Sequence, residues 1–187
     1  MGKPLFKEQF SIFPQLTYCP QYDPAKYEEI QAFYFEGMPL GDEKTRVFAY
    51  MGLPRNRKWP APAVVLVHGG GCHPDCEWIR QWTERGYIAL AMDTTGYFPA
   101  KEHTSFCEAD RGEWQHALPE DIKTAGYTVS PDNSEMKDIH VPLKDRWMYH
   151  AVSQVILAHN ILLSDSRVDA DRIGISGISW GDRKSVV

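Results

Sequence analysis

Two short apolar runs, separated by a glycine turn and a helical segment, constrain the fold of this chain more than any other feature. Residues 63–67 (AVVLV) and 87–92 (YIALAM) are unbroken, which is typical of strands buried on both faces of a parallel sheet. Between them, residues 75–85 predict a helix with Asp75 as N-cap and Gly86 as C-terminal stop. Strand, helix and strand in this order form a βαβ unit, so we expect an α/β fold with a mostly parallel sheet.

The remaining segments extend this pattern. Residues 172–176 (RIGIS) predict a third buried strand, and residues 142–163 predict a long amphipathic helix. Two further strands are expected at 30–37 and 44–52, joined by a turn that contains glycine, proline and aspartate. Residues 94–141 contain no long periodic segment, and loops of this length often carry function.

We divide the chain into three parts. Residues 1–29 predict an irregular lead-in, and residues 30–181 predict the N-terminal part of one α/β domain. Residues 182–187 (DRKSVV) bring neither apolar periodicity nor a helix cap, and one possible back-translation of them resembles a short-read sequencing adapter. We interpret them as an artefact at the end of a sequenced fragment; the alternative is a natural C-terminus.

Composition excludes several classes of protein. The 187 residues carry a net charge of −5 without a block of like charges, which argues against a nucleic-acid or polybasic membrane contact. The 43% of apolar residues favour a globular chain, and four cysteines are too few for a small disulfide scaffold. No segment is typical of a signal peptide or a membrane span. We therefore predict a cytoplasmic protein with no nucleic-acid or membrane partner. We make no prediction about its oligomeric state.

The pentapeptide Gly177-Ile178-Ser179-Trp180-Gly181 directly follows the third predicted strand. It matches G-x-S-x-G, a pattern that places a nucleophilic serine on a sharp turn from strand to helix. The Ser179 hydroxyl would be exposed there, while the side-chain-free Gly177 and Gly181 would let neighbouring backbone pack close. We predict that Ser179 is a catalytic nucleophile; the alternative is a tight turn whose serine caps a helix.

A second glycine-rich segment, His68-Gly69-Gly70-Gly71, follows the first apolar run. Acyl transfer builds negative charge on a carbonyl oxygen, and fixed backbone N–H groups stabilise that charge by about 3 kcal/mol each. We predict an oxyanion hole made by the N–H of Trp180 and that of Gly70 or Gly71, with His68 in a structural role. The alternative is a plain turn that needs glycine; a phosphate-binding loop is disfavoured because no matching glycine motif is present.

These motifs, with RGYIALAMD at 85–93 and DADRIGISGISWG at 169–181, resemble the bacterial acetyl xylan esterase-like α/β-hydrolases. They are also similar to the catalytic domain of prolyl oligopeptidase-type peptidases. The resemblance covers residues 44–181 and implies an α/β-hydrolase fold with a doubly wound, mostly parallel sheet. It further implies a Ser-His-Asp triad, ester or peptide substrates and no cofactor, with Ser179 as nucleophile and Trp180 and Gly70 as oxyanion donors.

The triad partners are expected outside this sequence. In α/β-hydrolases the chain order is serine, acid, histidine, so both partners would follow Ser179. Without a histidine base the serine hydroxyl is a weak nucleophile, and we expect this fragment to be nearly inactive. His150 and His159 lie on the predicted long helix, where a solvated or hydrogen-bonded histidine is commoner than a base. The open sheet edge of such a fragment would favour aggregation.

Other side chains are candidates for lesser roles. The segment Cys72-His73-Pro74-Asp75-Cys76 has metal-ligand residue types but no second ligand pair, so no metal is predicted and both cysteines are interpreted as ordinary loop and helix residues. Four acidic residues could touch substrate, although solvated surface is the simpler interpretation: Asp93, Glu108, Asp110 and Glu113. Four aromatic residues could line a pocket or pack in the core: Tyr97, Phe98, Phe106 and Trp114.

We predict a serine hydrolase that cleaves carboxylic esters through an acyl-enzyme. The substrate, a small-molecule or carbohydrate ester such as an acetylated sugar, follows from the resemblance alone. A prolyl oligopeptidase-type peptidase is the first alternative, but it usually carries a large accessory domain before the fold. A non-catalytic binding protein with a hydrolase fold is the second, and a dienelactone-type hydrolase would more often place cysteine at Ser179.

Overall fold

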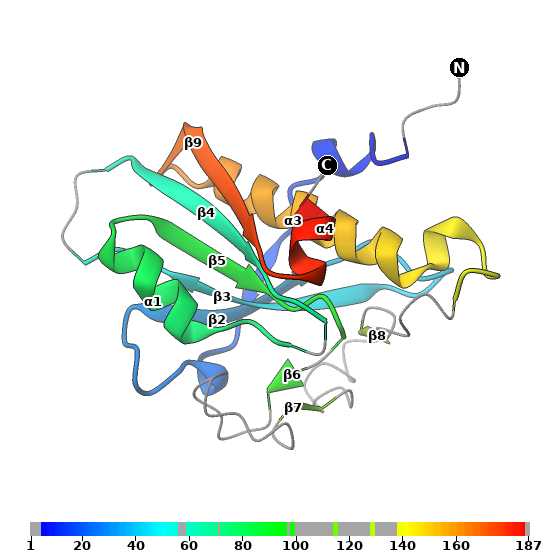
Figure 1. The fold of residues 1–187 in the computed structure, drawn as a ribbon, viewed down its shortest axis with the longest axis horizontal. Helices are drawn as coiled ribbons and strands as arrows, with labels where there is room; N and C mark the ends of the chain where they lie inside the picture. The colour runs from blue at the N-terminus through cyan, green and yellow to red at the C-terminus, as the bar shows by residue number, and fades with distance from the viewer. Residues whose placement is uncertain are drawn as a thin grey trace.

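The computed structural model of this chain describes residues 5–55, 59–70, 72–96, 98–99, 114–115, 128–129 and 138–185. Its main element is a seven-stranded sheet with the order β1-β2-β3-β5-β4-β9, in which β8 pairs with β3 outside this path (Figure 1). The strands are β1 (Leu16–Tyr18), β2 (Ile30–Glu36), β3 (Thr45–Gly52), β4 (Ala61–Val67), β5 (Ile88–Met92), β8 (Thr128–Val129) and β9 (Val168–Gly177). A separate antiparallel pair joins β6 (Phe98–Pro99) to β7 (Trp114–Gln115).

The described helices are α1 (Cys76–Glu84), α3 (Trp147–Ser164) and α4 (Trp180–Ser185). Short 3-10 helices form at η1 (Gln9–Ser11), η2 (Pro20–Tyr22) and η3 (Leu143–Asp145). Among the helices in these ranges, none is both long and apolar enough to cross a bilayer.

The three strands predicted from apolar runs form the parallel part of the sheet. β4 pairs in parallel with β5 on one side and with β9 on the other. The remaining neighbours, β1 with β2, β2 with β3 and β3 with β5, pair antiparallel. Parallel neighbours need crossover connections, and α1 and α3 lie in the connections that lead to β5 and to β9. The predicted α/β class and βαβ unit are confirmed.

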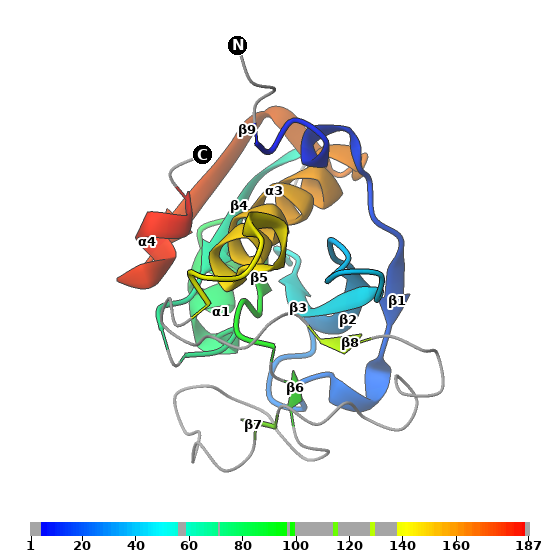
Figure 2. The same cartoon turned by 90° about the vertical axis from the view of Figure 1, so that its right-hand side faces the viewer.

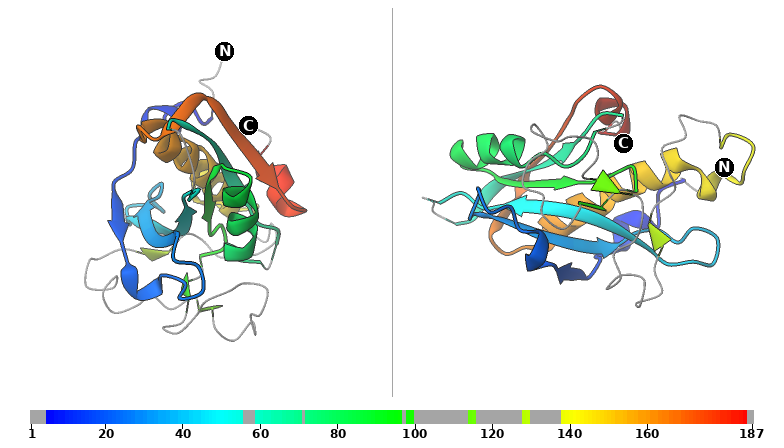
Figure 3. Two further views of the ribbon diagram at one scale, coloured as in Figure 1. Left: turned by 90° about the vertical axis from the view of Figure 1, so that its left-hand side faces the viewer. Right: turned by 90° about the horizontal axis from the view of Figure 1, so that it is seen from below.

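Helices α1 and α3 cover opposite faces of the sheet (Figures 2 and 3). Along β4, Val65 packs in one apolar cluster with Leu157 of α3, while Val64 and Leu66 pack in a second cluster with Ile79 of α1. Burying each such side chain contributes about 1.5–3 kcal/mol, which explains why this strand has apolar residues on both faces. A sheet with helices on both faces is doubly wound, as predicted.

Helix α1 begins and ends close to its predicted boundaries. The N–H of Glu77 donates a hydrogen bond of 2.8 Å to Oδ1 of Asp75, so Asp75 caps the helix. At the other end Gly86 adopts a φ of 88°, a conformation that glycine reaches without strain. The N–H of Tyr87 then donates to the carbonyl of Trp82 at 3.0 Å and closes the last turn.

The described part of the lead-in, residues 5–29, is more regular than predicted. Its strand β1 pairs antiparallel with β2, with Leu16 opposite Phe35, and extends the main sheet. Gln9 is fully buried, and its Nε2 donates to the Tyr149 hydroxyl of α3 at 2.7 Å. The prediction of an irregular segment is wrong here, because a three-residue strand and a single buried glutamine leave no periodic signal in the local sequence.

The long helix starts later than predicted. Residues 142–163 were expected to form one helix, but Leu143–Asp145 form η3 and Arg146 is extended, with φ −78° and ψ 143°. Helix α3 therefore begins at Trp147, whose N–H donates to Oδ2 of Asp138 at 2.5 Å. The start is set by an acceptor nine positions upstream, which helical periodicity does not reveal.

Strand β9 is confirmed as a strand but corrected in its burial. Residues 172–176 were expected to be buried on both faces, yet along β9 only Val168 is buried and Ile175 is 37% exposed. Among the described strands β9 pairs with β4 alone, so it forms an edge of the sheet. Ile173 packs against the α3-side core, while the residues around it face solvent.

Candidate active site

Ser179 lies on the turn between β9 and α4, at the carboxyl end of the parallel strands (Figure 1). Its φ is 57°, and within the described residues it is the only residue other than glycine with a positive φ. This left-handed conformation costs free energy for a residue with a Cβ, and such strain concentrates at functional sites. The side chain of Ser179 is exposed. The turn therefore presents the hydroxyl outward from a constrained backbone.

Two glycines of the pentapeptide allow the turn to close. A Cβ added to Gly181 would lie 2.0 Å from the carbonyl oxygen of Val67, and one added to Gly177 would lie 2.5 Å from the backbone of Gly181. Neither distance is compatible with a side chain. The N–H of Ile178 also donates to the carbonyl of Val67 at 3.1 Å. The turn after β9 is thus packed directly on the end of β4.

The glycine segment that follows β4 lies against this turn. A Cβ on Gly69 would be 3.2 Å from the Ile178 carbonyl oxygen and 3.4 Å from the Ser179 Cβ. A Cβ on Gly70 would be 2.8 Å from Cδ1 of Trp180. The structure thus brings Gly69, Gly70, Ser179 and Trp180 together. Gly71 lies outside the described residues.

His68 is buried beneath the glycine segment. Its Nε2 accepts a hydrogen bond from the N–H of Thr94 at 3.0 Å, and its Nδ1 lies 2.7 Å from the carbonyl oxygen of Gly69. Because Nε2 accepts, Nδ1 carries the proton and donates to that carbonyl. The imidazole therefore ties the loop after β4 to the loop after β5.

Asp93 corrects an expectation. A solvated carboxylate was the simpler interpretation, but Asp93 is buried and closes β5 as the centre of a hydrogen-bond cluster. Its carboxylate accepts from the N–H and hydroxyl of Thr95 and from the N–H of Gly96, at 3.0, 2.7 and 2.6 Å. Its Oδ1 also lies 3.4 Å from Nε2 of His68. The carboxylate holds the loop after β5 rather than facing solvent.

Trp147 and Thr94 were not predicted as site residues. Trp147, the first residue of α3, is buried and donates from Nε1 to the carbonyl of Thr94 at 2.6 Å. Its ring also meets that of Trp180 edge to face, with centroids 6.4 Å apart. In the sequence Trp147 belongs to an apolar helical stripe, which indicates core packing only. Thr94 offered a weaker signal, as the second residue after a buried strand.

The helix histidines are either hydrogen-bonded or partly exposed. His150 is buried and hydrogen-bonds the backbone of Lys144, while its Nε2 has no hydrogen-bond partner among the described residues. Burial lowers the pKa of His150 below its ordinary value, so the ring is neutral at pH 7. His159 is partly exposed.

Cys72 and Cys76 are not joined in a disulfide. Cys76 is buried in α1, and burial raises the pKa of its thiol far above the usual range, so it is not a reactive thiolate. Across the described ranges no group of three or more His, Cys, Asp or Glu side chains could hold a metal ion. The other residues singled out in the sequence, or their side chains, are not among those that the structure describes: Tyr97, Phe98, Phe106, Cys107, Glu108, Asp110, Glu113 and Trp114.

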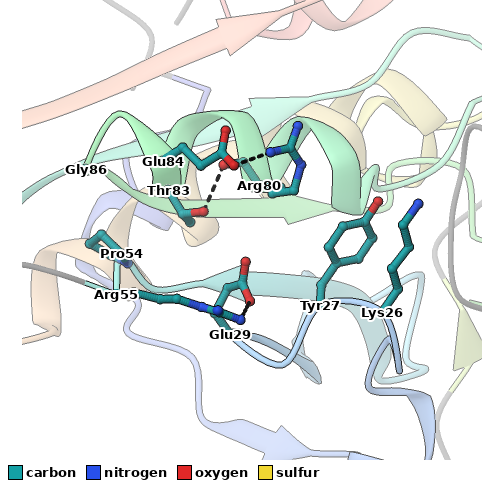
Figure 4. Close-up of a pocket in the computed structure, with 9 residues that line it drawn as sticks. All are labelled: Lys26, Tyr27, Glu29, Pro54, Arg55, Arg80, Thr83, Glu84 and Gly86. Carbon is teal, nitrogen blue, oxygen red and sulfur yellow. Dashed lines mark hydrogen bonds and ion pairs between the residues drawn. The ribbon is translucent and has the colours of Figure 1, made fainter.

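A cavity of about 540 Å³ lies at the opposite end of the strands from Ser179, near the amino end of β5. Figure 4 shows the residues that line it. It is lined by charged residues of both signs, and these pair with one another. Arg55 bonds Glu29 at 2.9 Å, and Arg80 bonds Glu84. Hydrogen bonds from Arg80 also lower the pKa of Glu77 to about 2. Ligands of open α/β sheets bind at the carboxyl ends of the strands, so the Ser179 turn is the better candidate.

Comparison with solved structures shows the fold of this chain. An acetyl xylan esterase from a Paenibacillus species aligns over 96% of this chain and 51% of its own, with a TM-score of 0.51 and 18% identity. Acetyl xylan esterase 1 from a Thermoanaerobacterium species aligns over 97% and 51%, with a TM-score of 0.52 and 16% identity. A Bacteroides fragilis protein provisionally assigned as an acetyl xylan esterase aligns over 96% and 46%, with a TM-score of 0.57 and 16% identity. The chain has the α/β-hydrolase fold.

The family follows from the sequence. The family model described as Acetyl xylan esterase (AXE1) matches residues 7–186. The chain belongs to the acetyl xylan esterase family, which confirms the resemblance found in its motifs. A comparison with curated proteins finds no match. The chain spans about half the length of the solved structures that it resembles.

Proposed function

We propose that this chain is part of a serine hydrolase that cleaves carboxylic esters, with Ser179 as its nucleophile. The observation that carries the proposal is the positive φ of Ser179 on an exposed turn that is packed against the glycine segment. A serine that only caps a helix does not require this backbone. Membership of the acetyl xylan esterase family supports ester substrates over peptides.

The reaction follows from this geometry. Ser179 Oγ attacks the ester carbonyl carbon while a base takes its proton, and the carbonyl oxygen becomes an oxyanion. Backbone N–H groups of Trp180 and of Gly70 or Gly71 stabilise that charge. The tetrahedral intermediate collapses to an acyl-enzyme, and the base returns the proton to the departing alcohol. Water, activated by the same base, then releases the acid; no cofactor takes part.

The base and its acid partner are proposed to lie outside this chain, because in α/β-hydrolases both follow the nucleophilic serine. His68 has both ring nitrogens engaged by backbone groups, so it is not available to Ser179. His150 is buried in α3. The half-length match to the related structures supports a source elsewhere in the protein. This chain alone is therefore proposed to be nearly inactive.

The proposed substrate is a small-molecule or carbohydrate ester, with an acetylated sugar as the leading example. The family name supports this class, and the exposed Ser179 leaves room for a bulky alcohol part. We place the protein in the cytoplasm, without nucleic-acid or membrane partners. None of the three described cysteines is joined in a disulfide, which agrees with a reducing compartment. Cell fractionation would contradict the placement by recovering the protein with membranes or in the medium.

Labelling with a fluorophosphonate probe tests the nucleophile. We would label this chain, a longer gene product of the length that the half-length match to the related structures suggests, and Ser179→Ala versions of both. Labelling of the longer protein alone, lost in Ser179→Ala, is the expected result. Labelling of this chain would place the base within it and overturn the proposed inactivity. A folded longer protein that does not label would favour a non-catalytic binding role.

Substrate assays separate the two hydrolase alternatives. The longer protein, not treated with the probe, would be given acetylated xylo-oligosaccharides, p-nitrophenyl acetate and a proline-containing peptide amide. Release of acetate without peptide cleavage is expected. Faster cleavage of the peptide would assign the protein to the peptidases and overturn the proposed ester specificity.

A further inference from the structure

We propose that the indole side chain of Trp180 is a positioning group for the oxyanion loop, in addition to the role of its backbone N–H. The oxyanion loop is defined here as residues 68–70. This inference rests on the proposed function, because a positioned N–H matters only if an oxyanion forms beside it. Trp180 occupies the variable position after Ser179 in the G-x-S-x-G motif, which does not itself specify a large aromatic side chain.

The indole packs directly on the backbone of Gly70. The position of a Cβ on Gly70 lies 2.8 Å from Cδ1 of Trp180 and 3.6 Å from both Cγ and Nε1. The five-membered ring therefore occupies the space that a side chain at Gly70 would need. Contact on this face prevents the loop from moving toward the elbow, as we call the turn formed by residues 177–181.

Trp180 is in turn held by a buried partner. Its ring meets that of Trp147 edge to face, at 6.4 Å between centroids and 76° between planes. Trp147 is 1% exposed and is fixed at two points, by Nε1 on the Thr94 carbonyl and by its N–H on Asp138. The indole of Trp180 thus lies between a rigid neighbour and the loop.

The contacts close into a circuit. Thr94 donates from its N–H to Nε2 of His68, and the ring of His68 bonds the Gly69 carbonyl through Nδ1. Starting from Gly69, the circuit runs through His68, Thr94, Trp147 and Trp180, and it returns to the loop at Gly70. The loop is thus hydrogen-bonded through the ring of His68 at Gly69 and packed against the indole of Trp180 at Gly70.

The circuit matters because the loop has no side chains of its own at Gly69 and Gly70. Its position has to be imposed by its neighbours, and hydrogen-bond donors stabilise an oxyanion only at a defined distance. A displacement of about 1 Å can lower a rate roughly a hundredfold. Since the oxyanion exists only near the transition state, loss of the indole should lower kcat and leave KM nearly unchanged.

The test uses p-nitrophenyl acetate and the longer protein encoded by the gene, with three variants. Trp180→Ala removes the indole, Trp180→Phe keeps an aromatic ring, and Trp82→Ala is the matched control. Trp82 is partly buried in α1 and pairs with Tyr87 edge to face at 5.0 Å, away from the elbow. We expect Trp180→Ala to lower kcat by roughly tenfold to a hundredfold, Trp180→Phe to restore most of it, and Trp82→Ala to change it less than about twofold.

Hydrogen exchange gives a readout that does not need activity. In this chain, the amides of residues 68–70 should exchange about tenfold faster in Trp180→Ala than in wild type, and no faster in Trp82→Ala. Equal kcat in the two alanine variants, or equal exchange of the loop, overturns the positioning role while leaving the esterase proposal intact. A fall in kcat that Trp180→Phe does not restore at all also overturns it. If Ser179→Ala keeps wild-type activity, the proposed function fails and this inference fails with it.

Discussion

Gly181 decides how closely the elbow approaches β4. Its Cβ position lies 2.0 Å from the Val67 carbonyl oxygen and 2.8 Å from that of His68, and both are backbone atoms that cannot rotate away. We therefore expect Gly181→Ala to lower the free energy of unfolding by about 1–3 kcal/mol. Urea denaturation of this chain measures the change.

Gly174 provides the matched control, because it lies in the adjoining strand and an added Cβ there meets nothing within 4 Å. Gly174→Ala should raise the free energy of unfolding by about 0.4–1 kcal/mol, through reduced entropy of the unfolded chain. Similar losses in both variants would show that close packing at the elbow is not the cause.

His150 makes stability depend on pH. Burial lowers its pKa in the folded state below the ordinary 6.5, while a hydrogen bond with the backbone of Lys144 and the nearby Asp145 and Asp138 oppose that shift. The folded state thus binds fewer protons than the unfolded state, and stability is lost as pH falls from 6.5 toward the folded pKa. Urea titrations above and below pH 6.5 should show this loss in wild type and a smaller loss in His150→Leu.

His159→Leu is the control for that prediction, since His159 is a partly exposed histidine on the same helix. The free energy of unfolding of His159→Leu should depend on pH in the same way as that of the wild type. If His150→Leu also follows it, another group is responsible for the pH dependence.

At the scale of elements, helix α1 tests whether the predicted N-cap, Asp75, stabilises the chain. The Asp75 carboxylate accepts the Glu77 N–H at 2.8 Å, and removing it leaves a helix N–H without that acceptor. Asp75→Ala should destabilise the chain by about 1 kcal/mol, whereas Asp75→Asn should cost only a few tenths. Thermal and urea unfolding would measure both, and an equal loss in the two variants would contradict the cap.

For the whole molecule, the edge strand β9 predicts self-association. Its outer edge has no partner among the described strands, and Ile175 and Ile178 are 37% and 57% exposed. Such an edge can pair with another chain. We expect this chain to form concentration-dependent oligomers in sedimentation velocity experiments, and Ile175→Lys to increase the monomer fraction.

Ile139→Lys is the control, because Ile139 is 63% exposed but lies before α3 and not on a strand. It should leave the association unchanged. A wild-type chain that stays monomeric at every concentration, or equal effects of both lysine variants, would rule out pairing through β9.

The sequence alone determined the βαβ unit and the place of the elbow. Strands that are covered on both faces need continuous apolar runs, and a sharp strand-to-helix turn needs its glycines, so residues 63–67, 87–92 and 177–181 carry these features locally. Helix α1 was likewise predictable from Asp75 and Gly86, because its caps are short-range.

The tertiary structure alone decided how the elbow is supported. The Thr94 bond to His68 spans 26 positions, and the Trp147 bond to the Thr94 carbonyl spans 53. It also decided that Asp93 is buried, that α3 begins at Trp147 and that β9 lies at an edge. Periodicity records which face of an element is apolar, but not which distant group will lie against it. These contacts therefore became visible only after the strands had brought their ends together.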